Sequence, residues 1–102
     1  MSALLEVLAD RVRGLASSLE SLATRTVRCR LAAHLLTRST LSTSSTLTLG
    51  GTQQEVAEEL GTVREVLARE LAAFRHDGII ETTAPGRYRI LDEAELVRIA
   101  TL

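Results

Sequence analysis

Leucine and valine recur along the first segment of the chain at steps of three and four residues. This is the a/d spacing of a heptad repeat, narrower than the apolar stripe of an ordinary surface helix. A single helix cannot bury such a seam, so the spacing predicts a dimerisation helix and hinge over residues 1–25 that pairs with a second copy of the chain. Packing back onto the chain's own domain is the alternative. The predicted dimer positions are Leu5, Leu8, Val12, Leu15, Leu19 and Leu22.

The heptad pattern breaks at residues 23–26, and a second helix is predicted to follow. Thr26 has the hydroxyl side chain that favours an N-cap, and Val27, Leu31 and Leu35 mark a core-facing side. A connector rich in serine and threonine comes next. It ends in the alternating residues 46–49, which are typical of a short strand. We therefore expect a second domain over residues 26–102.

Residues 52–76 predict two short helices joined by a glycine turn, as in a helix-turn-helix motif. Thr52 and Glu55 have the spacing of a capping box, in which each side chain bonds the other residue's backbone amide. Gly61 suits the left-handed turn after the first helix. Residues 62–65 repeat the capping-box spacing and predict a second helix over residues 62–76.

The second helix carries an outward face that suits base recognition. Arginine can bond guanine O6 and N7 together, glutamate can accept from the cytosine amino group, and small neighbours let a helix enter the major groove. The alternative is a solvated face on which Glu65 and Arg69 form an ordinary ion pair, and this helix alone leaves both open. The face consists of Arg64, Glu65, Ala68, Arg69 and Ala72.

Two further elements follow the motif. Residues 79–82 and 87–90 flank a Pro85–Gly86 turn signal and predict a hairpin. A hairpin at this place would form a wing, from which Arg87 can reach a phosphate beside the groove. Asp92 is expected to begin a last helix, with Leu96, Val97 and Ile99 packed on the domain.

Composition narrows the class of protein. The chain has 102 residues, 45% of them apolar, which suits a small helical domain and excludes a large catalytic one. It offers no nucleophile–base pair, phosphate loop or cluster of metal ligands, so we expect neither an enzyme nor a metal site. The lone Cys29 cannot form an intramolecular disulfide. No apolar run approaches the ~18 residues of a membrane span, so we expect a cytoplasmic protein without a membrane partner.

Charge is distributed unevenly along the chain. The formal net charge is −1, and all 12 basic residues are arginine. Residues 21–50 hold four arginines and no acid, whereas residues 51–81 hold seven acids and three arginines. A protein that coats nucleic acid uniformly would be basic throughout. If DNA is the partner, its contacts must be few and well placed.

With these elements in order, the chain resembles the C-terminal half of the Crp/Fnr family of bacterial transcription regulators. The resemblance covers almost the whole chain. It implies a mainly α fold with a small β wing, in which a long N-terminal dimerisation helix precedes a winged helix-turn-helix domain. The residues that carry it are Arg30-Leu31-Ala32, the run 52–57, Leu60-Gly61, Arg64-Glu65, Arg69, Gly78-Ile79-Ile80 and Ile90-Leu91-Asp92.

The resemblance also implies a function and its residues. Arg64, Glu65 and Arg69 would read bases, and a homodimer would read an inverted-repeat operator in double-stranded DNA. RNA polymerase is a further candidate partner. We expect no cofactor, because the effector-binding β-barrel of full-length relatives has no counterpart here, and any effector is unknown. Glu70 departs from the family's commonly apolar pattern. The expected phosphate contacts are Thr52, Gln54, Thr62 and Arg87.

The other class of function that the sequence allows is protein docking. Winged helices also serve as interaction modules, and the acidic stretch 51–81 would repel phosphate at long range. The sequence alone leaves this alternative open.

Overall fold

The computed structural model describes residues 25–102. The predicted dimerisation positions, from Leu5 to Leu22, lie outside the described residues. The described part opens with a helix over residues 25–41. It continues with β1 (Leu47–Thr48), α2 (Gln53–Glu59), α3 (Arg64–His76), β2 (Ile80–Ala84), β3 (Arg87–Ile90) and α4 (Glu93–Ala100). This is the expected mainly α fold with a small β wing.

The helix over residues 25–41 forms one wall of the core. Val27, Leu31 and Leu35 are buried, as their spacing predicts, and together they present one apolar side to the rest of the domain. The N-cap prediction is wrong, because residues 25 and 26 are both helical and Thr26 therefore lies inside the helix.

The three strands described form one antiparallel sheet in the order β1-β3-β2. β1 pairs with β3 at one edge, so the alternating segment 46–49 does form a short edge strand. Two side chains of the 25–41 helix hold it in place. Arg38 Nε donates to Thr48 O at 3.0 Å, and His34 Nε2 lies 2.7 Å from Leu49 O.

The β2–β3 hairpin turns at Pro85 and Gly86, as predicted. Gly86 has φ +73°, a left-handed conformation that glycine adopts without steric cost. The pairing contains an irregularity between Thr82 and Ala84. Tyr88 of β3 points into the core, so one face of the wing closes the domain and the other faces solvent.

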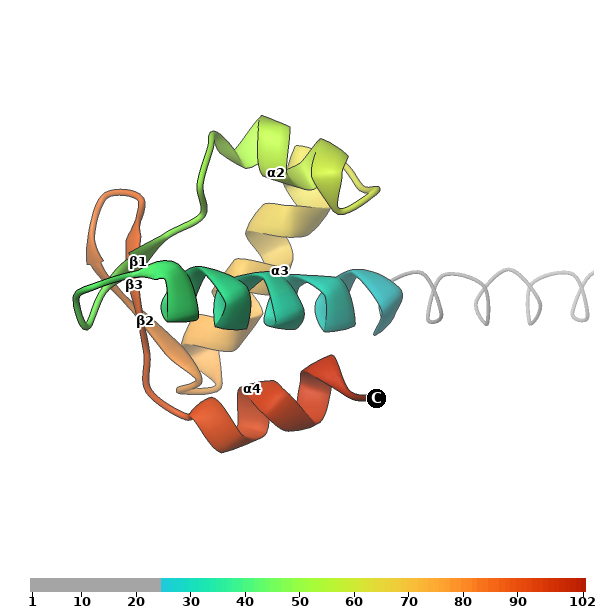
Figure 1. Cartoon of the computed structure of the whole chain (residues 1–102). Helices are drawn as coiled ribbons and strands as arrows, with labels where there is room; N and C mark the ends of the chain where they lie inside the picture. The colour runs from blue at the N-terminus through green and yellow to red at the C-terminus, as the bar shows by residue number, and fades with distance from the viewer. Residues whose placement is uncertain (1–24) are drawn as a thin grey trace, which may run out of the picture.

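α4 covers the side of the core that α2 leaves open (Figure 1). Asp92 caps it by accepting from the Glu95 amide at 3.1 Å. Leu96 and Ile99 are buried as expected, but Val97 is 43% exposed and does not belong to the core contact. The largest fully buried side chains of the described residues come from five elements: Phe74, Leu31, Leu35, Leu67, Ile80, Leu96 and Val56.

Candidate DNA-binding surface

α2 begins with the predicted capping box. The Glu55 amide donates to Thr52 Oγ1, and the Thr52 amide donates to Glu55 Oε1, each at 3.1 Å. The hydrogen bond to the Thr52 backbone holds the pKa of the Glu55 carboxyl below its ordinary value. The amide and the hydroxyl of Thr52 are both engaged with Glu55 in this capping box, so a phosphate contact by Thr52 would compete with that carboxylate.

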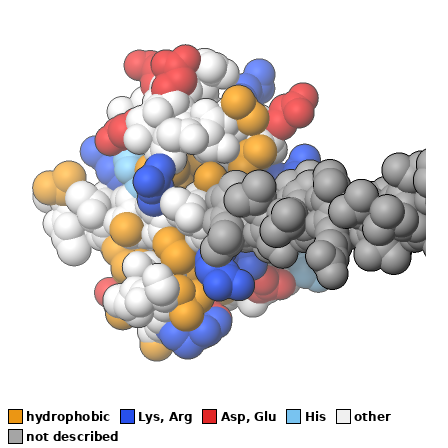
Figure 2. All heavy atoms as spheres, turned by 90° about the vertical axis from the view of Figure 1, so that its right-hand side faces the viewer, with side chains coloured by type: hydrophobic (Ala, Val, Ile, Leu, Met, Phe, Trp, Pro, Cys, Tyr) orange, Lys and Arg blue, Asp and Glu red, His pale blue; other side chains and the backbone are white. Residues whose placement is uncertain are grey.

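Acidic side chains surround this predicted phosphate contact. Gln54 is exposed, but its Nε2 donates to Glu58 Oε1 at 3.0 Å. Glu55, Glu58 and Glu59 are all exposed, and Figure 2 shows carboxylates gathered at the top of the molecule, over α2. Long-range electrostatics at the start of α2 therefore oppose a phosphate, and any contact there must rely on short-range hydrogen bonds.

The turn between α2 and α3 is fixed by backbone and side-chain hydrogen bonds. Gly61 has φ +75°, its amide donates to Glu58 O at 3.0 Å, and the Thr62 amide donates to Ala57 O at 2.8 Å. These two bonds make a Schellman motif. Arg30 Nη1, from the 25–41 helix, donates to Leu60 O at 3.1 Å. The relative orientation of α2 and α3 is thus determined locally.

The second predicted capping box is absent. α3 begins at Arg64, its N-cap residue is Val63, and no side-chain hydrogen bond caps it. The Thr62 amide donates to Ala57 O in the Schellman motif that ends α2, so it cannot also donate to Glu65, and the helix starts two residues later than expected. Thr62 is half-buried beside the start of α3.

α3 separates an inner face from an outer face as predicted. Leu67, Leu71 and Phe74 are buried. The predicted reading face is exposed along its whole length: Arg64, Glu65, Ala68, Arg69 and Ala72. No ion pair joins Glu65 to Arg69 within residues 25–102. The contact on which the solvated-face alternative depends is therefore not formed.

The arginines of residues 25–102 fall into two groups. Most donate to a carboxylate, hydroxyl or carbonyl oxygen of the domain itself, and these are Arg28, Arg30, Arg38, Arg75, Arg89 and Arg98. The others make no such bond among the described residues, and these are Arg25, Arg64, Arg69 and Arg87. Three of the four are residues that the sequence predicts to contact DNA.

The wing places Arg87 at the start of β3, exposed and directly after the Pro85–Gly86 turn. Its neighbour Arg89 is occupied by Glu81 across the hairpin, with Nη1 and Oε1 2.6 Å apart. Arg75 Nη1, near the end of α3, donates to Thr82 Oγ1 of β2 at 3.3 Å. The hairpin is therefore tied to α3, and its free cation lies next to the turn.

Glu70 was the unexpected charge on the second helix, and the structure shows its partner. Glu70 lies on the inner side of α3 with 2% of its surface exposed, and Arg28 Nε is 2.8 Å from its Oε2. The hydrogen bond to Glu70 raises the pKa of Arg28 above its ordinary value. Sequence reasoning missed this pair because 42 residues separate its members.

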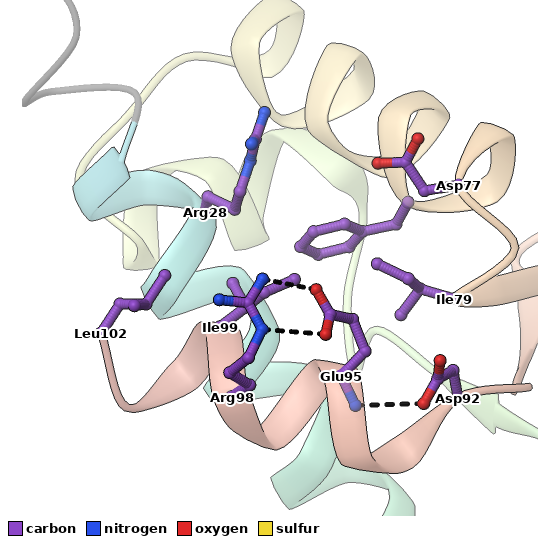
Figure 3. A pocket seen from close by; sticks show the side chains of 9 residues that line it. Arg28, Asp77, Ile79, Asp92, Glu95, Arg98, Ile99 and Leu102 are labelled. Atoms are coloured by element: carbon purple, nitrogen blue, oxygen red, sulfur yellow. Dashed lines mark hydrogen bonds and ion pairs between the residues drawn. The ribbon is translucent and has the colours of Figure 1, made fainter.

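A cavity of about 420 Å³ lies between the 25–41 helix, the end of α3 and α4 (Figure 3). Phe74, Ile79 and Ile99 supply its apolar lining. Two of its charged lining residues pair with each other, since Arg98 Nε donates to Glu95 Oε2 at 2.9 Å. Within residues 25–102 no group of three or more potential ligands could hold a metal ion, and no helix is long and apolar enough to cross a membrane.

The fold and this surface define a winged helix-turn-helix protein whose second motif helix presents free guanidinium groups. A model of the Crp-like helix-turn-helix domain family matches residues 29–99, and the chain belongs to that family.

Solved structures agree with this assignment. The catabolite activator protein of Thermus thermophilus is 28% identical, with a TM-score of 0.78 over 96% of this chain and 45% of that protein. The CO-dependent transcription factor CooA of Carboxydothermus hydrogenoformans is 26% identical, with a TM-score of 0.67 over 92% of this chain and 45% of that protein. DNR of Pseudomonas aeruginosa, at 24% identity, shares the fold with a TM-score of 0.79 over 95% and 43%.

The chain thus spans less than half the length of each of these structures. Among curated proteins, no sequence matches it.

Proposed function

We propose that this chain is the DNA-binding part of a transcription regulator and that α3 reads base edges in the major groove. One observation carries the proposal: the guanidinium groups of Arg64 and Arg69 are exposed and unpaired within the described residues, whereas most other arginines there are engaged. An arginine already bonded to its own domain would have to break that bond to read a base. These two need not.

The neighbours of the two arginines support the same role. Ala68 and Ala72 share the exposed face and leave room for the groove walls. Glu65, also exposed and without an ion pair to Arg69, is available to accept from a cytosine amino group. Arg64 and Glu65 lie in the first turn of α3, where recognition helices usually contact bases.

Phosphate contacts would position α3 in the groove without reading sequence. We assign this role to Thr52 and Gln54 at the start of α2, to Thr62 at the turn and to Arg87 on the wing. Arg87 is the strongest of the four, because it is a free cation, whereas Gln54 is bonded to Glu58.

The heptad positions from Leu5 to Leu22 support a homodimer, and two copies of α3 related by a two-fold axis would read an inverted repeat. RNA polymerase remains a candidate partner of the bound dimer.

Selection of duplexes from a random pool by the purified chain tests the proposal directly. We expect an enriched inverted repeat and a measurable preference for it over scrambled duplex at low salt. Failure to enrich or shift any duplex would contradict DNA binding and favour a docking module, for which the acidic surface of α2 is the supporting observation.

A further inference from the structure

Glu70 is the one charged side chain among residues 25–102 that the fold buries. It directly follows Arg69 of the reading face, yet it points to the opposite side of α3, among Leu67 and Leu71. A buried carboxylate is costly unless it is paired and hydrogen-bonded. Its retention at this position calls for a contribution other than packing.

The partner of Glu70 comes from outside the helix-turn-helix motif. Arg28 lies on the 25–41 helix, near the end at which the chain enters from residues 1–24, and its side chain extends toward α3 along the wall of the cavity (Figure 3). Its Nε donates to Glu70 Oε2 at 2.8 Å. The guanidinium is a rigid, planar donor, so this bond fixes direction as well as distance.

The other residues buried on the inner face of α3 are apolar and make no directional bond. Leu67, Leu71 and Phe74 bury apolar surface, and such burial is non-directional. Side chains reach about 5–6 Å from a helix axis, so a rotation of α3 by about 10° would move their tips by about 1 Å. Recognition geometry tolerates about 0.5 Å.

The same helix also holds the turn that leads into α3. Arg30, two residues after Arg28, bonds Leu60 O at the end of α2. The 25–41 helix therefore contacts the motif through one arginine at the turn and another on the inner side of α3 itself.

We propose that Arg28 and Glu70 are positioning residues for base recognition: their ion pair sets the rotation of α3 about its axis and thereby aims Arg64 and Arg69. This inference rests on the proposed DNA-binding function. We expect the pair to act on discrimination between sequences, because phosphate contacts position the protein without reading sequence.

The test replaces both members by apolar residues of similar size, Arg28→Met with Glu70→Leu. Glu70 is buried, whereas the side chain of Arg28 is 43% exposed. Because the double replacement leaves no buried carboxylate without its partner, the variant is expected to fold and to unfold at a temperature close to that of the wild type. The measurement is the ratio of affinities for the selected operator and its single-base variants. We expect this ratio to fall about tenfold, the effect of one weakened bidentate contact, with affinity for random duplex unchanged.

Two matched variants complete the design. Glu70→Gln keeps an acceptor for Arg28 and is expected to retain most of the discrimination. The control Glu95→Gln with Arg98→Gln removes another ion pair, on α4, and is expected to leave the ratio unchanged. If the apolar double variant does not fold, Arg28→Lys tests the positioning role instead. The lysine ammonium lacks the rigid fork of a guanidinium, so this variant is expected to discriminate severalfold less well between the operator and its single-base variants.

The outcomes separate the two proposals. A folded double variant with a wild-type ratio overturns the positioning role, and so does an equal loss on operator and random duplex, because that would indicate a structural role only. If the double variant does not fold and Arg28→Lys keeps the wild-type ratio of affinities for the operator and its single-base variants, the positioning role is overturned as well. A wild-type chain that prefers no sequence contradicts the proposed function, and the positioning role fails with it.

Discussion

At the scale of single residues, the free arginines of α3 lead to the first prediction. Arg64→Ala should cost about 1–3 kcal/mol of operator affinity and relax discrimination at one base pair, because an unpaired guanidinium in the first helical turn loses its base contact. Titration against a set of half-site variants measures both effects. The control is Arg75→Ala on the same helix, whose guanidinium is bonded to Thr82. An unchanged base preference in Arg64→Ala would remove the assigned role.

The capping box of α2 leads to a prediction about acid. The pKa of Glu55 is lower in the folded chain than its ordinary value of 4.5, because the carboxylate accepts from the Thr52 amide. Folding therefore favours the ionised form, and this stabilisation is complete above the ordinary value and is lost as pH falls through the lowered one.

Glu55→Gln keeps a hydrogen-bonding side chain but removes the charge. We expect the wild type to be the more stable chain above pH 4.5 and the difference to shrink as pH falls below that value. Urea unfolding of both chains over this range measures it. A difference that stays constant with pH would show that the ionised carboxylate of Glu55 contributes nothing to stability.

Residues whose role depends on local spacing could be predicted, and residues whose role depends on a distant partner could not. Thr52 and Glu55 are three positions apart, so sequence alone indicates their mutual bonds. Glu70 stands out in sequence only as an unexpected charge. Its pairing with Arg28 depends on how the 25–41 helix lies against α3, which no local pattern encodes.

At the scale of elements, the uncapped start of α3 predicts a stabilising substitution. Val63 occupies the N-cap position in extended conformation (φ −112°, ψ 158°), and its side chain is 59% exposed. Serine there would accept from an amide of the first turn at little cost in burial. Val63→Ser should raise the free energy of unfolding by about 0.5–2 kcal/mol relative to Val63→Ala, measured by urea unfolding. Equal stability of the two variants would contradict this explanation.

The same helix start shows why element boundaries were harder to predict than elements. Both helices of the motif, the hairpin and α4 follow from apolar spacing and glycine positions. The start of α3 was placed two residues early because capping-box spacing at 62–65 ignores the turn before it. The Thr62 amide donates to Ala57 O at the end of α2, so it is not available to the Glu65 carboxylate as a capping box requires. The N-cap prediction for Thr26 is also wrong, because Arg25, the residue before it, is already helical.

At the scale of the whole molecule, the acidic surface of α2 predicts weak non-specific binding. Non-specific affinity comes from neutralising phosphates, and Glu58 and Glu59 lie exposed in the helix whose start is expected to face one. Dissociation constants for random duplex should therefore lie near the weak end of the usual range, about 10⁻⁴ M.

Glu58→Gln with Glu59→Gln should raise affinity for random duplex about two- to fivefold, as expected for exposed charges that each contribute under about 1 kcal/mol. The base preference should not change, because neither residue lies on α3. Titration at low salt with operator and random duplex tests both statements. A gain confined to the operator would contradict the electrostatic explanation.

The proposed reading of an operator by α3 calls for two copies of the chain. The exposed face of α3 carries the three side chains proposed to read bases, and three side chains would contact only part of one half-site, so we expect a single copy to be poorly selective. If the heptad positions join two copies, the half-sites should be centred about 10–10.5 base pairs apart, or a multiple of that spacing.

Leu8→Glu with Leu15→Glu should then yield a protein of single-chain mass that binds inverted repeat and isolated half-site equally. Equilibrium sedimentation and titration against both duplexes check this, with Ser18→Glu as a control that adds charge outside the seam. A wild-type chain of single-chain mass that still prefers the inverted repeat would require a different source of symmetry.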